Sequence, residues 1–254
     1  MKNKHSLGQN WLKDRSVLEE IAELAFEDVD LCVEIGPGLG TLTSSLLRRF
    51  KKVLAIELDE SLAKNLPKSF PRKNLDVRNE DILKFDFSEI NEPFVVAGNI
   101  PYYITSPIIE KLLALKKKPK RIVLLVQKEV AEKVAGKDGN SSLSLFVDNF
   151  AEAFLGPIVT KNFFTPPPKV DSRVLILIPR EIPKTLPEEG VLEFVHKSFG
   201  NPRKKLSANL STFVGISKAE LEKLLEEKGI EKNARPADLS LDDYAMLAKT
   251  LKKR

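Results

Sequence analysis

The segment from residue 31 to residue 50 restricts the fold of this chain more than any other. Residues 31–35 form a short apolar run typical of a buried strand, a loop with three glycines follows, and residues 41–50 have the pattern of a helix. This order opens the α/β folds that bind nucleotides, because glycine lets the backbone approach a ligand and a helix N-terminus favours a negatively charged group. We therefore predict a mostly parallel sheet covered by helices.

The spacing of the glycines separates two kinds of nucleotide cofactor. A dinucleotide fingerprint requires a third glycine where this chain has Thr41. The sequence Glu34-Ile35-Gly36-Pro37-Gly38-Leu39-Gly40 instead fits the Glu-x-Gly-x-Gly-x-Gly loop of methyltransferases, with Glu34 in the leading position. The loop therefore favours S-adenosylmethionine (SAM) over a nicotinamide dinucleotide.

Three of the further strands that are expected end in residues that suit a ligand. They are residues 52–56, 75–78 and 94–97. Glu57 can accept hydrogen bonds from two ribose hydroxyls, which dinucleotides and SAM share, while Asp81 can accept from an adenine amine and Ile82 can pack on the ring. A surface turn capped by Asp81 is the alternative. Because ligands bind at the carboxyl ends of parallel strands, these residues and Asn99 should converge on one crevice.

The residues after the fourth strand, Gly98-Asn99-Ile100-Pro101-Tyr102-Tyr103, suit methylation of an adenine amine. The lone pair of that amine is delocalised into the ring, and two acceptors can localise it: the side-chain oxygen of Asn99 and a nearby main-chain carbonyl. Pro101 makes Ile100 extended and so directs that carbonyl. Tyr102 offers a face on which a base can stack. The alternative is a plain strand exit stopped by proline.

A second aromatic segment precedes three consecutive prolines. Phe163 and Phe164 come shortly before Pro166, Pro167 and Pro168. A proline run is stiff and extended, so it can present the two rings as a wall that holds a flipped-out adenine. A hydrophobic plug before a turn is the alternative.

The chain changes character after Pro179, where strand patterns end and four helical patterns follow. We predict two domains, a catalytic domain with an N-terminal arm at residues 1–182 and a small all-α domain at residues 183–254. The fold class is therefore α/β, a Rossmann-like class I methyltransferase with a mostly parallel seven-stranded sheet and a helical C-terminal domain.

The chain has a net charge of +5, and many of its basic residues are clustered in short runs, which suit contacts to phosphate. The candidates for RNA contact are Lys117, Lys118, Arg203, Lys204 and Lys205, and a further run ends the chain at residues 252–254. Solvated surface lysines are the alternative for any one run.

One cysteine and two distant histidines leave little material for a disulfide or a metal site, so no metal is expected. The chain has neither a secretory signal nor an apolar run that could span a bilayer, so we expect a cytoplasmic protein without a membrane partner.

Taken together, these motifs resemble the ribosomal RNA adenine dimethyltransferases of the small-subunit type, which modify two adjacent adenines near the 3′ end of 16S rRNA. The resemblance covers nearly the whole chain. It rests on residues 9–12, 34–40, 57, 81, 99–103, 163–172, 199–206 and 235–240. Trp11 stands where the family is expected to have phenylalanine, and Ile100 replaces the commoner leucine.

The resemblance implies roles for particular residues. The arm would close over SAM, and the cofactor contacts would be Asn10, Leu12, Gly36, Gly38, Glu57, Leu58, Asp81, Ile82 and Asn99. The target base would be held by Asn99, Ile100, Pro101 and Tyr102 together with Phe163 or Phe164. The implied partner is 16S rRNA within the small ribosomal subunit, and we expect a monomer.

The resemblance predicts direct methyl transfer from SAM to the adenine nitrogen, twice per base, with positioning and electrostatics supplying the rate. Three alternatives remain at this point. A large-subunit rRNA adenine dimethyltransferase shares the chemistry, a ribosome assembly factor could act mainly by binding, and a nicotinamide oxidoreductase is disfavoured by Thr41.

Overall fold

The computed structural model describes residues 10–71, 73–137, 139–186 and 190–251. The chain forms two compact units, one made of the residues up to Ala131 together with Ala151–Glu181, and the other of Glu132–Phe150 and the residues from Ile182 onward. The boundary at residue 181 lies one residue from the expected 182. Residues 132–150, however, belong to the second unit, whereas the sequence analysis assigned them to the first.

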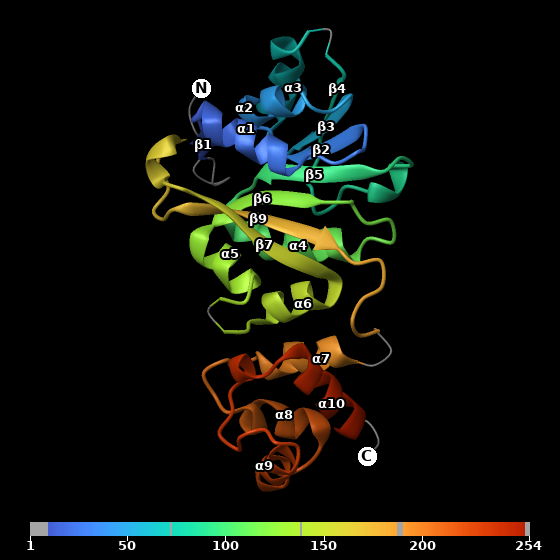
Figure 1. Ribbon diagram of the computed structural model, residues 1–254, viewed down its shortest axis with the longest axis vertical. Coiled ribbons are helices and arrows are strands. Elements are labelled where there is room, and N and C mark those ends of the chain that lie inside the picture. The colour runs from blue at the N-terminus through green and yellow to red at the C-terminus, as the bar shows by residue number, and fades with distance from the viewer. Residues whose placement is uncertain (1–9, 72, 138, 187–189, 252–254) are drawn as a thin grey trace. The chain divides into compact units, whose positions relative to one another are not determined.

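The first unit is built on the expected seven-stranded sheet, whose order is β4-β3-β2-β5-β6-β9-β7 (Figure 1). The strands are β2 (Leu31–Ile35), β3 (Lys52–Glu57), β4 (Leu75–Asn79), β5 (Phe94–Asn99), β6 (Ile122–Gln127), β7 (Ala151–Val159) and β9 (Ser172–Pro179). The first five in this spatial order run parallel. Strand β9 lies antiparallel between β6 and β7. The predicted fold class is confirmed.

Helices precede, connect and follow the parallel strands, and the last of them crosses the boundary into the second unit. They are α1 (Arg15–Leu24), α2 (Thr41–Leu46), α3 (Glu60–Ser69), α4 (Thr105–Ala114) and α5 (Lys128–Val134), with short 3-10 turns at η2 (Phe87–Glu89), η3 (Tyr102–Ile104) and η4 (Lys161–Phe163). Leu18, Ile21 and Ala22 of α1 are buried, and they pack with α2 on side chains of the strands in one core cluster. Burial of this apolar face stabilises the helix on the sheet.

A two-stranded sheet that the sequence analysis did not predict holds the N-terminal arm. Strand β1 (Trp11–Leu12) pairs antiparallel with β8 (Phe164–Thr165), and the Lys13 amide donates to the Phe163 carbonyl at 2.9 Å. Leu12 is buried in the core of the first unit. The arm is therefore fixed to the segment that precedes the three prolines.

The second unit is all helical, as expected. Its helices are α6 (Ser142–Phe150), α7 (Val191–Ser198), α8 (Leu206–Val214), α9 (Lys218–Glu227) and α10 (Leu241–Leu251). Leu145 of α6 packs in the same core as the C-terminal helices. Tyr244 lies at the centre of this core, where its hydroxyl contacts the Ser198 hydroxyl at 2.7 Å and donates to the Pro236 carbonyl at 3.1 Å. Among the described residues, no helix is long and apolar enough to cross a membrane.

Candidate active site

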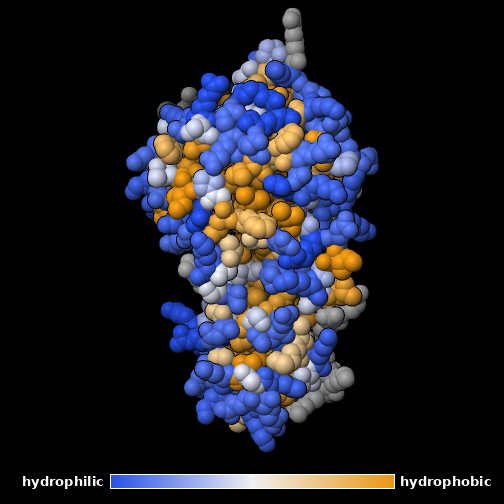
Figure 2. Space-filling model, viewed as in Figure 1, coloured by the Kyte–Doolittle hydropathy of each residue, from blue (hydrophilic) through white to orange (hydrophobic). Residues whose placement is uncertain are grey.

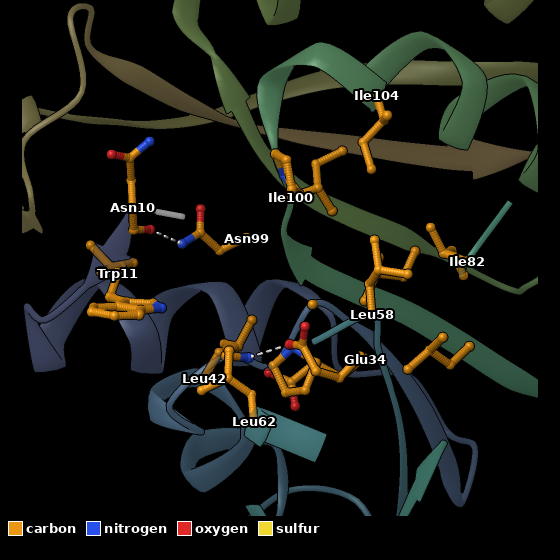
Figure 3. Close-up of a pocket in the computed structure, with 18 of the residues that line it drawn as sticks. Asn10, Trp11, Glu34, Leu42, Leu58, Leu62, Ile82, Asn99, Ile100 and Ile104 are labelled. Atoms are coloured by element: carbon orange, nitrogen blue, oxygen red, sulfur yellow. Dashed lines mark hydrogen bonds between the residues drawn. The ribbon is translucent and has the colours of Figure 1, made fainter. Parts of the chain in front are cut away.

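One pocket lies where strands β2, β3, β4 and β5 end, as expected for ligand binding at the carboxyl ends of parallel strands (Figure 3). All nine predicted cofactor contacts line it, namely Asn10, Leu12, Gly36, Gly38, Glu57, Leu58, Asp81, Ile82 and Asn99. Ile100, Pro101 and Tyr102 line it as well. The structure thus brings four strand ends and the N-terminal arm together.

The glycine loop fits closely against the other parts of the pocket. Gly36 and Gly38 have φ angles of 65° and 57°, a backbone conformation that side chains disfavour. A Cβ atom on Gly38 would lie 3.2 Å from the indole of Trp11, and one on Gly36 would lie 3.9 Å from the Asn99 carbonyl oxygen. The backbone conformation therefore favours glycine at both positions, and the nearness of the arm adds to this preference at Gly38.

Glu57 is fixed by main-chain donors on two sides. Its Oε2 accepts from the Gly38 amide at 3.0 Å and its Oε1 accepts from the Asp59 amide at 2.9 Å. Burial raises the pKa of Glu57 above its ordinary value, although these amides oppose the shift. The carboxylate predicted to bind a ribose therefore also holds the glycine loop in place.

Glu34 is the leading residue of the glycine motif, and its side chain is buried at the floor of the pocket. Its Oε2 has no hydrogen-bond partner among the residues that the structure describes. Burial raises the pKa of Glu34 to about 8, and the nearby carboxylate of Glu57 adds to the shift. A buried polar atom without a partner suits a ligand that brings a hydrogen-bonding group. Sequence reasoning recognised the motif but not this property.

Asp81 and Ile82 follow strand β4 and form another wall of the pocket. The Oδ1 of Asp81 accepts from the Leu83 amide at 2.9 Å, so the residue does cap a turn, as the alternative interpretation supposed. A carboxylate has further acceptor capacity after one such bond. The capped turn and a contact to an adenine amine are therefore compatible.

Asn99 is the last residue of β5, and its side-chain amide is held in one orientation. Its Nδ2 donates to the main-chain carbonyl of Asn10 at 2.9 Å, and Figure 3 shows the two groups facing each other beside Trp11. The amide oxygen of Asn99 is thus the atom left to accept from a ligand. Pro101 has a φ of −60°, the value that its ring imposes, and a ψ of 132°.

Tyr102 is anchored through its hydroxyl. The hydroxyl contacts that of Ser172 at 2.7 Å, and Ser172 is fully buried at the start of β9. Burial raises the pKa of Tyr102 above its ordinary value. The next residue, Tyr103, is 62% exposed. The motif therefore lines the pocket with two rings, one fixed through its hydroxyl and one largely exposed.

The two phenylalanines before the prolines have different environments. Phe164 is 3% exposed and belongs to the core cluster that includes α1, whereas Phe163 is 39% exposed. Neither lines the pocket of the four strand ends. Only Phe163 presents a ring to solvent, so the idea that both rings are displayed does not hold for Phe164.

The predicted RNA contacts fall into two groups. The ammonium of Lys117 donates to the carbonyls of Ile90 and Asn91, and that of Lys118 donates to the Arg180 carbonyl at 2.8 Å, so both help to hold loops together. Arg203, Lys204 and Lys205 are exposed before α8. Hydrophilic side chains cover much of the face drawn in Figure 2, so exposure alone does not distinguish these residues. Within the described ranges, no cluster of side chains suits a metal ion.

Comparison with known proteins places this site in a family. The family model described as ribosomal RNA adenine dimethylase matches residues 1–253. The chain belongs to that family. The resemblance inferred from the motifs is therefore confirmed, and the chain is an rRNA adenine dimethyltransferase that uses SAM as its methyl donor.

Individual relatives cover almost the whole chain. The ribosomal RNA small subunit methyltransferase A of Bacillus cytotoxicus is 37% identical, over 98% of this chain and 91% of the relative. The protein of the same name from Lactococcus lactis is 38% identical, over 98% of this chain and 90% of the relative. Among solved structures, a dimethyladenosine transferase from Plasmodium falciparum matches with a TM-score of 0.77 and 29% identity, covering 95% of this chain and 97% of that one. The 23S rRNA methyltransferase ErmE matches with a TM-score of 0.76 and 29% identity, covering 95% and 99%.

Proposed function

We propose that this enzyme dimethylates two adjacent adenosines in the 3′-terminal hairpin of 16S rRNA within the small ribosomal subunit, and that it acts in the cytoplasm as a monomer. Relatives named as small-subunit methyltransferases, at 37% and 38% identity over almost the whole chain, support the choice of subunit. The observation that carries the chemistry is the oriented amide of Asn99 at the mouth of the pocket.

The residues of the pocket fit SAM, which supplies a methyl group bound to a positively charged sulfur. Gly36 and Gly38 leave room for the backbone to approach the donor, and the unpartnered Oε2 of Glu34 leaves a buried polar atom that can hydrogen-bond a polar group of the donor. We assign Glu57 to the ribose, and Asp81 with Ile82 to the adenine of the donor. Asn10, Leu12 and Leu58 complete the walls of the pocket.

We assign the activation of the target amine to Asn99. Its Oδ1 accepts one amine hydrogen while a main-chain carbonyl of residues 99–100 accepts the other, which localises the nitrogen lone pair. The nitrogen then bonds to the methyl carbon as the carbon–sulfur bond breaks, its electron pair returns to sulfur, and a proton leaves the amine to water. Asn99 acts by position, so no strong base is required.

We assign the holding of the target base to two rings. The bond between Tyr102 and Ser172 fixes one ring before substrate arrives, which lowers the entropic cost of stacking. Phe163 is the exposed phenylalanine of its pair, so we assign the second contact to it rather than to Phe164. Arg203, Lys204 and Lys205 are proposed to hold the RNA backbone.

The deciding experiment measures the transfer of labelled methyl groups from SAM to undermethylated small subunits. The expected product is dimethyladenosine at two adjacent positions near the 3′ end of 16S rRNA, located by primer extension. Label in large-subunit RNA would favour the function of the 23S methyltransferase whose fold is shared. Binding of small subunits without any transfer of label would favour an assembly factor that acts by binding alone.

A further inference from the structure

Lys111 joins two parts of the catalytic unit that are distant in sequence. It lies on α4, the helix that follows the Asn99–Tyr102 motif through η3. Its ammonium donates to the Leu83 carbonyl at 2.9 Å and to the Phe85 carbonyl at 2.6 Å. Hydrogen bonds from a charged donor are stronger than neutral ones. The side chain therefore connects α4 with the segment that follows β4.

The segment held by Lys111 is the one that carries Asp81 and Ile82. Within it, the amides of Lys84 and Phe85 donate to the Asp81 carbonyl at 2.8 and 2.9 Å, and these bonds form a tight turn. Asp81, at the start of the turn, lines the pocket. The carbonyls of Leu83 and Phe85, later in the turn, accept hydrogen bonds from the Lys111 ammonium. A shift of those carbonyls would therefore move the pocket wall.

Aromatic packing fixes the far end of the segment, which includes Phe85, the residue whose amide closes the turn. The rings of Phe85 and Phe87 are buried and meet edge to face at 5.0 Å, and Phe87 stacks on Phe94 of β5 at 5.9 Å. The Lys111 ammonium lies 5.7 Å from the centre of the Phe87 ring, within the range of a cation–π contact. These contacts anchor residues 85–87, which leaves Lys111 to restrain the carbonyl of Leu83.

The charges around Lys111 suit the same role. Partial burial lowers the pKa of Lys111 below its ordinary value, while the negative charges of Asp81, Glu80 and Asp86 oppose this shift and favour the charged form. The positive charge of Lys111 thus offsets the negative charge of these carboxylates. Without it, mutual repulsion would favour movement of Asp81 away from its neighbours.

We propose that Lys111 is a positioning residue that holds Asp81 and Ile82 against the adenine of the methyl donor. This inference rests on the proposed assignment of these two residues to the donor adenine. Lys111 itself does not line the pocket. It acts through the turn, and it couples that turn to the helix that begins beside the catalytic motif.

The test compares the binding of two product analogues by calorimetry: S-adenosylhomocysteine, and S-inosylhomocysteine, which carries an oxygen in place of the adenine amine. The wild-type enzyme should bind the first at least about tenfold more tightly, because the inosine oxygen faces the Asp81 carboxylate without a hydrogen to donate. Lys111→Met should raise the Kd of S-adenosylhomocysteine by about tenfold and abolish most of this preference. Lys111→Arg should restore most of both.

Turnover provides a second readout. Lys111→Met should raise the KM for SAM with little change in kcat at saturating SAM, because the catalytic motif is left intact. Lys52→Met is the matched control. The Lys52 ammonium pairs with Glu92 at 2.9 Å, and Lys52 is the first residue of β3 whereas Glu57 is the last. Neither the Kd of S-adenosylhomocysteine nor the preference between the two analogues should therefore change. If the methionine variant does not fold, Lys111→Gln replaces it, and the same changes in Kd, preference and KM are expected of it.

Two failures can be told apart. A folded Lys111 variant with the wild-type Kd and the wild-type preference between the two analogues would overturn the positioning role. A wild-type enzyme that binds neither analogue, or that binds both equally, would instead refute the assignment of the pocket or of Asp81 to the donor adenine.

Discussion

Replacing Glu34 by glutamine should change how the stability of this enzyme depends on pH. Burial raises the pKa of Glu34 from its ordinary value of 4.5 to about 8 in the folded chain. Because the pKa is higher in the folded chain than in the unfolded one, the contribution of Glu34 to the free energy of unfolding is fully present below about pH 4.5. This contribution is lost as pH rises through about 8. Across that window the unfolded carboxyl is ionised while the folded one still holds its proton.

The size of the effect follows from the shift. Each unit of pH within the window costs about 1.4 kcal/mol of unfolding free energy, so the full penalty approaches about 5 kcal/mol. Between about pH 5.5 and about pH 7.5, the free energy of unfolding of Glu34→Gln relative to wild type should therefore rise by about 3 kcal/mol. Urea unfolding followed by circular dichroism at several pH values measures this difference directly.

Glu19 provides a control of opposite sign. It is paired with Arg48 and Arg49, the latter at 2.7 Å, and the hydrogen bond from Arg49 lowers its pKa to about 2. Its stabilising contribution is present above about pH 4.5 and is lost as pH falls towards 2, so the Glu19→Gln difference should be constant from about pH 5.5 to 7.5. If the Glu34→Gln difference is equally constant, the carboxyl is not held neutral by burial and the reasoning is refuted.

Three further outcomes are expected. Asn99→Ala should lower kcat by about 10²- to 10³-fold while the Kd for SAM changes little, and near-normal turnover on undermethylated small subunits would contradict its role. Neutralising Arg203, Lys204 and Lys205 together should weaken RNA binding and reduce the slope of log K against log salt by about 2 to 3, and an unchanged slope would exclude phosphate contacts there. Tyr244→Phe should cost about 1 to 2 kcal/mol in urea unfolding because the Ser198 hydroxyl and Pro236 carbonyl lose a buried partner, and an unchanged midpoint would show that these bonds contribute nothing net.

The parallel part of the fold and its pocket could be predicted from the sequence because both depend on local patterns. An apolar run followed by glycine or a carboxylate indicates the end of a buried strand, and parallel strands necessarily bring such ends together. Asp81 and Asn99 therefore reached the same pocket without any knowledge of long-range packing. The environment of Glu34 could not be predicted in this way, because burial and the lack of a partner depend on the surrounding side chains.

The features that were missed all depend on contacts between distant segments. Strand β1 has only two residues, and its partner β8 lies about 150 residues later, so no periodicity signals the pair. Phe163 and Phe164 have the same chemistry, but Phe163 ends the turn η4 and Phe164 begins β8, and only the second ring packs in the core cluster that includes α1. Residues 142–150 form a helix, but a local apolar pattern does not say which core such a helix joins.

The path of the chain between its two units limits how the enzyme can be divided. The chain leaves the sheet after Ala131, contributes α6 to the helical unit, returns at Ala151 and leaves again after Glu181. A truncation at residue 181 would keep every strand but expose Leu145 and leave the buried amide of Asn149 without Thr185, whose main-chain amide donates to it at 2.7 Å. Loss of activity in such a fragment would therefore report misfolding as much as loss of RNA contacts. A clean separation requires residues 132–150 to be replaced by a short linker in the same step.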